Sequence, residues 1–275
     1  VVQVLTPGTY TEYQAQNQNH YLVSILPLVG KRFALSYVDV STGELKVTQL
    51  ENLEEVRSEC SSLMCREVVL VDSDVTEELR HLFTSMQILI STIEKDEINA
   101  EDCTDLVSEL EDEASIRCVQ NLLSYLKLTQ KRSFSHLQKA QAYQSEFYLS
   151  MNYETKRNLE LTTTIRANQK HGSLFWFLDE TQTAMGGRLL KQWLEKPLVL
   201  EGAIQKRHAL VETLNQHYFE RTDFIETLKR VYDLERIVGK VSFGTANARD
   251  LLQLKQTLGQ VPIFKSIVDS LDSEE

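Results

Sequence analysis

The stretch LDETQTAMGGRLLKQWLEKPL, residues 178–198, gives the clearest indication of local structure in this chain. Its apolar side chains recur three or four residues apart, which predicts a helix with one apolar face. Pro197 disfavours helical geometry at the residue before it, so we expect the helix to end there. The residues that form the predicted apolar face are Met185, Leu189, Leu190, Trp193 and Leu194.

The start of this predicted helix contains small and polar residues. Thr181 or Thr183 can accept a hydrogen bond from the first free backbone amides of the helix. Gly186 and Gly187 follow in the first turn, where each costs about 1 kcal/mol relative to Ala. We therefore expect another backbone to approach this turn closely. Burial of Trp193 predicts a loss of roughly 3–5 kcal/mol on replacement by Ala.

The segment MGGRLLKQWLEKP, residues 185–197, resembles the core-domain signature of the MutS family of bacterial DNA mismatch-repair proteins. DLERIVGKVSFGTANARDL, residues 233–251, is similar to the next block of that family. VLTPGT, residues 4–9, resembles the start of the family's connector domain, and KRNLEL, residues 156–161, is a shorter match. The order of these segments is that of the family, so the resemblance covers nearly the whole chain.

We interpret the residues of these signatures as structural. Asp233 and Glu235 are expected to lie at the positive end of a helix, and Thr245 is expected to cap the helix that follows. Arg249 and Asp250 are candidates for pairing across domains. The complete set of structural signature residues is Thr6, Pro7, Gly8, Thr9, Met185, Gly186, Arg188, Leu189, Leu190, Trp193, Leu194, Pro197, Asp233, Leu234, Glu235, Arg236, Arg249, Asp250 and Leu251.

The first part of the chain alternates between predicted strands and helices. Three strands joined by tight turns predict an antiparallel meander, and the strand–helix–strand units that follow predict parallel pairing. This pattern predicts a mixed sheet with flanking helices, and the resemblance implies a ribonuclease H-like connector domain over residues 1–130. The strands are expected at 21–28, 32–39, 44–50, 68–71 and 88–92, and the helices at 53–63 and 76–82. One long helix or two shorter ones are expected over 105–128.

The remainder, residues 131–275, is predicted to be all-α and corresponds by resemblance to part of the core and lever domain. We expect the chain to be one piece of a longer protein, because it begins with Val1 and the family's members are much longer. Helix faces such as Leu251, Leu254 and Leu258 are then expected to stay exposed. The helices are expected at 153–165, 184–194, 204–216, 219–231, 234–241 and 246–258.

Charge and cysteine usage limit the possible classes of function. Residues 1–130 carry 9 basic and 22 acidic side chains, whereas residues 131–275 carry 20 and 18. Neither part has the basic character of a stand-alone DNA binder. Four cysteines without ligand spacing argue against zinc and favour a reducing, cytoplasmic location. No apolar run is long enough to span a membrane.

Several sequence features suggest chemistry but are better explained by packing or capping. A ribonuclease H-like nuclease needs metal-binding carboxylates, and the first predicted strand has none. Asp39 and Asp72 are therefore expected to be turn caps. No phosphate-binding loop is present. Phe224 begins a Phe-x-Glu string, the family's mismatch-reading motif, but it is expected to face a helical core. The histidines, which are expected in packing or surface roles, are His20, His81, His136, His171, His208 and His217.

By resemblance, the parent protein is a homodimeric ATPase that binds mismatched DNA and recruits MutL. This piece lacks the mismatch-reading and ATPase domains, so we expect no enzyme activity, no catalytic, cofactor or metal residue, and a structural, signal-coupling role. ATP and magnesium belong to the missing ATPase domain. The acidic run Glu94–Glu113 is the candidate contact for MutL. The alternatives are an independent interaction adaptor with an inactive ribonuclease H-like domain and, less favoured, a metal-dependent nuclease.

Overall fold

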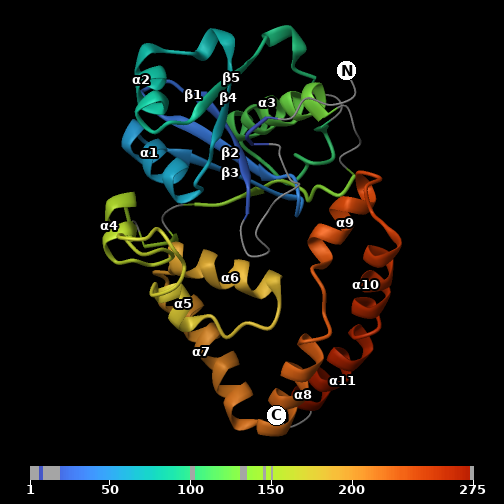
Figure 1. Cartoon of the computed structure of the whole chain (residues 1–275). Coiled ribbons are helices and arrows are strands. Elements are labelled where there is room, and N and C mark those ends of the chain that lie inside the picture. The colour runs from blue at the N-terminus through green and yellow to red at the C-terminus, as the bar shows by residue number, and fades with distance from the viewer. Residues whose placement is uncertain are drawn as a thin grey trace. The chain divides into compact units, whose positions relative to one another are not determined.

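The computed structural model describes residues 6–8, 19–99, 103–130, 135–144, 147–149 and 151–272. The chain divides into two compact units, Val1–Gln144 and Ser145–Glu275 (Figure 1). The first unit is an α/β layer structure, and the second is predominantly helical. The predicted fold class, a mixed sheet with flanking helices followed by an all-α region, is confirmed.

Within the described residues, the first unit contains a six-stranded sheet in the order β5-β4-β1-β2-β3-β6 (Figure 1). The first three strands form the predicted antiparallel meander, and β4 and β5 run parallel beside β1. The last strand pairs in parallel with β3. It was not predicted, because two residues carry no recognisable alternation. The strands are β1 Tyr21–Pro27, β2 Phe33–Asp39, β3 Glu44–Leu50, β4 Glu67–Val71, β5 Leu89–Ile93 and β6 Gln141–Ala142.

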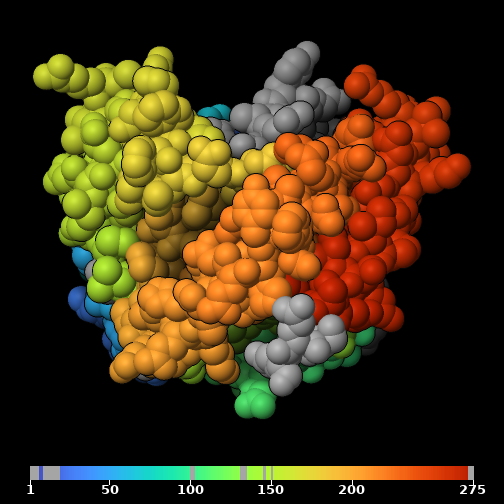
Figure 2. Space-filling view, turned by 90° about the horizontal axis from the view of Figure 1, so that it is seen from below, coloured from blue at the N-terminus to red at the C-terminus, as the bar shows by residue number. Residues whose placement is uncertain are grey.

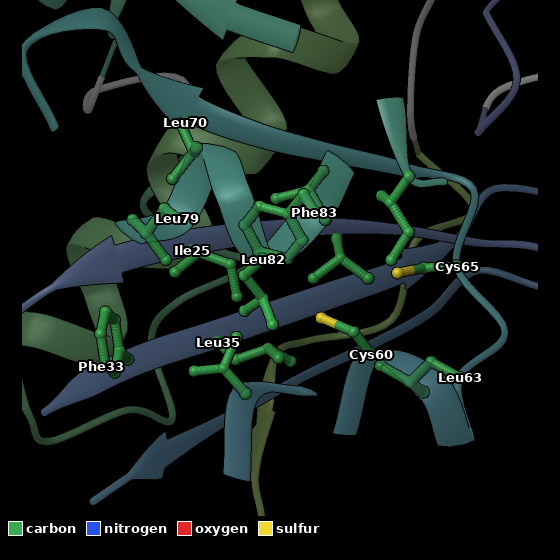
Figure 3. Close-up of a cluster of buried hydrophobic side chains, with 14 of the residues drawn as sticks. Ile25, Phe33, Leu35, Cys60, Leu63, Cys65, Leu70, Leu79, Leu82 and Phe83 are labelled. Atoms are coloured by element: carbon green, nitrogen blue, oxygen red, sulfur yellow. The ribbon is translucent and has the colours of Figure 1, made fainter. Parts of the chain in front are cut away.

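Helices contribute to hydrophobic clusters on both faces of this sheet, so its central strands are apolar on both sides. The larger cluster joins Ile25 and Leu35 of the sheet to α1 (Leu53–Ser62) and α2 (Glu77–Ser85), and Figure 3 shows these side chains interdigitating. The other cluster joins Leu26 and Ala34 to Cys118 of α3 (Glu113–Gln130). Consecutive residues of β1 therefore point to different helical layers.

The cysteines are buried and free, as the sequence predicted. Cys60 lies in the last turn of α1, and Cys65 follows that helix after Met64, whose φ is +48°. The Cys65 amide donates to the Cys60 carbonyl at 3.3 Å. This is a Schellman ending, in which the two side chains meet as its apolar contact (Figure 3). Burial raises the pKa of the Cys118 thiol to about 11.

The helix predicted over residues 105–128 begins eight residues later than expected. Residues 104–109 form turns, and α3 starts at Glu113. Asp112 sets this start because its Oδ2 accepts from the Ser115 amide at 2.7 Å. A short polar side chain that bonds the first free amides is a strong helix initiator. Two short 3-10 helices, η1 Asp72–Asp74 and η2 Lys95–Glu97, complete the first unit.

The described regular elements of the second unit are helical, with one β-bridge between Tyr148 and Leu198. Helix α8 packs against α7 and α11, α9 against α10, and α5 against α6. In Figure 2, α7 and α8 form an orange band beside the red α10 and α11. The helices are α4 Tyr153–Asn158, α5 Leu174–Leu178, α6 Ala184–Glu195, α7 Glu201–Gln216, α8 Tyr218–Leu228, α9 Leu234–Ser242, α10 Ala248–Leu258 and α11 Val261–Asp272.

One prediction for this unit was wrong, and helix α11 (Val261–Asp272) was not predicted. The helix expected over 153–165 ends at Asn158, because Glu160 takes φ +49° and the β-branched run 162–165 disfavours helix. Helix α11 was missed, because Gly259 and Pro262 look like stop signals. Pro262 instead occupies the first turn of α11, where its missing amide is tolerated.

Candidate functional site

The densest polar junction among the signature residues is centred on Arg188 of α6. Its side chain is buried, and its Nη1 and Nη2 donate to the two carboxylate oxygens of Asp233 at 2.7 and 2.8 Å. Nη2 also donates to Glu235 Oε2 at 2.5 Å. Asp233 is in turn the N-cap of α9, accepting from the Arg236 amide at 3.4 Å. One guanidinium therefore fixes the start of α9 on α6.

The electrostatics of this junction favour the charged guanidinium. Burial lowers the pKa of Arg188, but its hydrogen bonds and charge interactions with Asp233 and Glu235 outweigh burial and raise the pKa above its ordinary value. A bidentate guanidinium–carboxylate pair fixes orientation as well as distance. The junction is suited to holding two helices in register.

A second junction joins α9 to α10. Lys240 Nζ lies 2.8 Å from Asp250 Oδ1, and Asp250 forms a reciprocal capping box with Asn247. The backbone hydrogen bond from Asn247 and the bond from Lys240 lower the pKa of Asp250. The two junctions therefore connect α6, α9 and α10 within the second unit. Asp250 was predicted to pair with a residue of another domain. Its partner is instead Lys240, ten residues earlier in the same unit.

The caps of these helices differ in part from the predictions. Thr183, one of two candidates, caps α6 by accepting from the Gly186 amide at 3.0 Å. A Cβ built on Gly186 would meet the Thr183 hydroxyl and Thr181 Cβ at 3.1 and 3.4 Å, so the predicted close approach of another backbone was wrong at this glycine. Helix α10 is capped by Asn247, whereas the predicted cap Thr245 donates its hydroxyl to the Lys240 carbonyl.

The apolar face of α6 is not buried as predicted. Trp193 is 41% exposed and Leu189 is 47% exposed. The Arg207 guanidinium of α7 lies 3.6 Å from the centroid of the Trp193 ring, a cation–π contact. The face is therefore only partly covered, with Met185, Leu190 and Leu194 half-buried. The loss of 3–5 kcal/mol predicted for Trp193→Ala is therefore too large for this chain, because it assumed full burial.

The other signature residues of the second unit lie around these junctions. Pro197 accepts from the Leu149 amide at 2.8 Å, next to the β-bridge. Arg249 and Leu251 are exposed on α10, as predicted for the latter. The remaining signature residues, which are all half-buried, are Met185, Leu190, Leu194, Leu234 and Arg236.

The first-unit signature contacts a residue that the sequence analysis missed. The Gly8 amide donates to Glu67 Oε2 at 2.8 Å, and Glu67 is fully buried at the start of β4. Pro7 is exposed and Thr6 is half-buried, whereas Thr9 lies outside the described residues. Glu67 is the first residue of the strand EVVLV, which is otherwise apolar. This exception to the strand pattern was the signal in the sequence that could have identified Glu67.

Comparison with known families assigns both units. MutS domain II matches residues 20–138, and MutS domain III matches residues 154–275. The chain belongs to the MutS family. The ranges place strands β1 to β5 in domain II, the connector, and both ion-pair junctions in domain III, the core.

Similar proteins carry the name DNA mismatch repair protein MutS. Those of Streptococcus agalactiae and Bacillus licheniformis are each 44% identical, over 276 and 274 residues that cover 100% and 99% of this chain. That of Geobacillus sp. is 41% identical over 277 residues and 100% of this chain. The chain spans about a third of the length of these relatives, 32%, 31% and 32% respectively.

Asp39 and Asp72, the two candidate nuclease carboxylates, lie at opposite ends of the sheet of the first unit. Asp39 pairs with Tyr21 at the start of β1, whereas Asp72 follows β4 at the level of Pro27. Because the two acids lie at the levels of the first and last of the seven residues of β1, their backbones are about 20 Å apart. Asp39 is a turn cap, as predicted, because its Oδ1 accepts from the Ser41 amide at 2.8 Å. Among the described residues, no group of three potential ligands could hold a metal.

The remaining candidates have packing or surface environments. Phe224 lies in α8 of the second unit, and the centroid of its ring is 5.0 Å from that of Phe264 in α11. It therefore faces a neighbouring helix, as expected. The acidic side chains described between Glu94 and Glu113 are exposed, and Glu109 pairs with Lys139 at 3.3 Å. No described helix is long and apolar enough to cross a membrane.

Proposed function

We propose that this chain is the structural and signal-coupling part of a MutS-type mismatch-recognition protein and performs no reaction itself. The tandem match to MutS domains II and III supports this function. The junctions supply the physical basis, because they fix the relative positions of α6, α9 and α10. The 44% identity to a protein named DNA mismatch repair protein MutS also favours this role over an independent adaptor.

The whole protein would bind mismatched DNA as a homodimer in the cytoplasm and hydrolyse ATP with magnesium outside this chain. A strut between a DNA-reading part and an ATPase part must transmit displacement, and a rigid ion-pair junction does so better than a mobile loop. In this proposal, Arg188 is a positioning residue that acts through α9.

The test asks whether mismatch binding and ATP hydrolysis by the whole protein can be uncoupled. Arg188→Lys keeps the charge but loses the bidentate fork. We expect heteroduplex affinity and nucleotide binding to be retained, while the stimulation of ATP hydrolysis by mismatched DNA falls several-fold. Lys229→Ala is the control, because it removes an exposed ion pair with Glu226 on α8. Full stimulation in Arg188→Lys would contradict a coupling role for this junction.

We also propose that the connector recruits MutL through the acidic run Glu94–Glu113. The exposed acids give this surface the charge complementary to a basic partner. The double charge reversal Asp96→Lys with Glu97→Lys should weaken MutL capture and flatten its salt dependence. The matched control is Glu77→Lys with Glu78→Lys, an exposed acidic pair at the start of α2 in the same unit. Equal capture by both variants would exclude the proposed surface.

A further inference from the structure

Two of the buried cysteines face each other at the end of α1. Cys60 lies in the last turn of that helix, and Cys65 follows the helix after Met64, which has a positive φ. The Cys65 amide donates to the Cys60 carbonyl at 3.3 Å, so the two backbones lie side by side. The sulfur atoms point toward each other, as Figure 3 shows.

This geometry suits a bond between the two sulfurs. A disulfide joins residues whose backbones are already close, with Cα atoms about 4.4–6.8 Å apart. In a Schellman ending, the residues joined by the outer hydrogen bond are neighbours in space. A short approach of the sulfurs, rather than an opening of the helix, would therefore close a disulfide between Cys60 and Cys65.

The two thiols have different roles in such a reaction. The hydrogen bond to Cys65, together with burial, raises the pKa of the Cys60 thiol well above its ordinary value. Cys60 therefore keeps its proton and donates it toward Cys65. A hydrogen bond of this kind stabilises negative charge on the sulfur that accepts it. Cys65 is thus suited to attack a reactant, and Cys60 is suited to complete the disulfide.

Cys65 is also the thiol nearer to the surface. Its exposed fraction is 6%, whereas Cys60 is fully buried. The residues on either side of Cys65, Met64 and Arg66, are both exposed. Access is narrow, so the geometry favours a small reactant over a bulky one.

We propose that Cys60 and Cys65 are a reversible oxidation site for a small hydroperoxide. With hydrogen peroxide, the Cys65 thiolate attacks one oxygen and the O–O bond breaks, which leaves a sulfenic acid on Cys65 and releases water once the thiol proton is included. The Cys60 sulfur then attacks the sulfenic sulfur, the S–O bond breaks, and the disulfide forms as a second water leaves. The thiols lose two electrons and the peroxide gains them. This site does not depend on the proposed function.

Peptide mapping of the whole protein after brief treatment with hydrogen peroxide tests the site. Trypsin cuts after Arg57 and Arg66, so both cysteines are released in one peptide, residues 58–66. Thiols that remain free are alkylated in denaturant before digestion. We expect this peptide to lack alkyl groups and to be lighter by two hydrogen atoms, and we expect reduction to restore both thiols.

The chain supplies two controls for this measurement. Met64 is 51% exposed and lies in the same peptide, so the peroxide dose is set to oxidise about half of it. Cys118 is fully buried on α3 and should be recovered alkylated. A peptide with oxidised Met64 and two alkylated cysteines would overturn the proposal, because the reactant then reached the segment without closing the disulfide.

Single variants test the order of attack. Cys60→Ser keeps the attacking thiol and removes its partner, so the sulfenic acid on Cys65 should accumulate and be trapped by dimedone. Cys65→Ser leaves only the buried Cys60, and trapping should be about ten-fold weaker. Cys118→Ser is the matched control and should still form the disulfide within residues 58–66. Equal trapping in Cys60→Ser and Cys65→Ser, or loss of the disulfide in Cys118→Ser, contradicts the proposal.

Discussion

Arg188 shows how one side chain sets the relation between helices that are distant in sequence. Its partner Asp233 is 45 residues away and is itself the cap of α9. Periodicity predicted α6 and α9 separately, and resemblance marked both residues as signature positions. Their pairing was not foreseen, because no local pattern records which acid a buried arginine will meet. Glu67 was recognisable as an acid in an apolar strand, but its donors Gly8, Ser91 and Tyr125 lie in three distant segments and could not be foreseen.

The first prediction concerns the stability contributed by this arginine. Arg188→Ala leaves Asp233 and Glu235 without their guanidinium and should lower the free energy of unfolding of the second unit by about 2 kcal/mol. This is below the 3–5 kcal/mol of fully buried pairs, because both acids are partly solvated. Urea denaturation measures the change. Lys229→Ala, at an exposed pair, should cost at most about 0.5 kcal/mol.

The second prediction concerns the pH dependence of the first unit. Burial lowers the pKa of His136, and the bond between its Nε2 and the Val40 carbonyl only partly opposes this. The unfolded chain therefore binds the proton first as the pH falls below about 6.5. Stability should decrease from that pH until the lower folded-state pKa is passed, and then level off.

The measurement is the free energy of unfolding between pH 8 and pH 5.5 for the original protein and for His136→Gln. The variant removes the titrating group and should show a flatter profile in this window. The carboxylates of Asp112, Asp179 and Asp250, whose pKa values are lowered, titrate at more acidic pH and do not obscure the comparison. Parallel profiles would show that His136 is not responsible.

At the scale of elements, prediction succeeded where local signals agreed. The meander was predictable, because three short apolar runs are joined by tight turns that contain Gly30 and Gly43, both with positive φ. Helices α6 and α9 were predictable from apolar spacing and caps. The errors lie where a cap overrides periodicity: Asp112 starts α3, and Glu160 ends the run after α4. A single hydrogen bond or dihedral angle decides such ends, and a spacing pattern cannot reveal it.

The third prediction separates two candidate caps of α10. Asn247 accepts from the Asp250 amide at 3.0 Å, and Asp250 returns a bond to the Asn247 amide at 3.0 Å. Asn247→Ala should therefore destabilise the second unit by about 1 kcal/mol. Thr245→Ala should have a smaller effect, because Thr245 only donates to the Lys240 carbonyl at 3.4 Å. Urea denaturation of both variants checks the difference; a larger loss at Thr245 would reverse the assignment.

At the scale of the whole molecule, the two units differ in how they are stabilised. The first has clusters of fully buried residues on both sides of its sheet, such as Leu35, Leu70, Phe83 and Leu122. In the second, many large apolar side chains stay exposed, including Trp193 on α6 and Leu251 and Leu258 on α10. Apolar burial therefore stabilises the second unit less than it stabilises the first.

The fourth prediction follows from this contrast. In urea, the second unit should lose structure before the first, giving two transitions rather than one. Hydrogen exchange read at α10 and at β2 distinguishes them: α10 should exchange at lower urea, with β2 still protected. A single transition, with both elements released together, would mean that the units stabilise each other enough to unfold as one.

The fifth prediction is that this chain self-associates through the exposed apolar residues of α10. Leu251 and Leu258 are 51% and 52% exposed, and Leu252 is 62% exposed. Apolar side chains grouped on one helix gain free energy when a second surface covers them. The sedimentation coefficient should rise with protein concentration. This rise should persist at high salt, because salt does not screen apolar contacts. The double variant Leu252→Gln with Leu258→Gln should reduce this association, whereas Glu226→Gln with Lys229→Gln on α8 should not. Strictly monomeric behaviour of the unaltered chain would imply that these side chains find cover within the second unit.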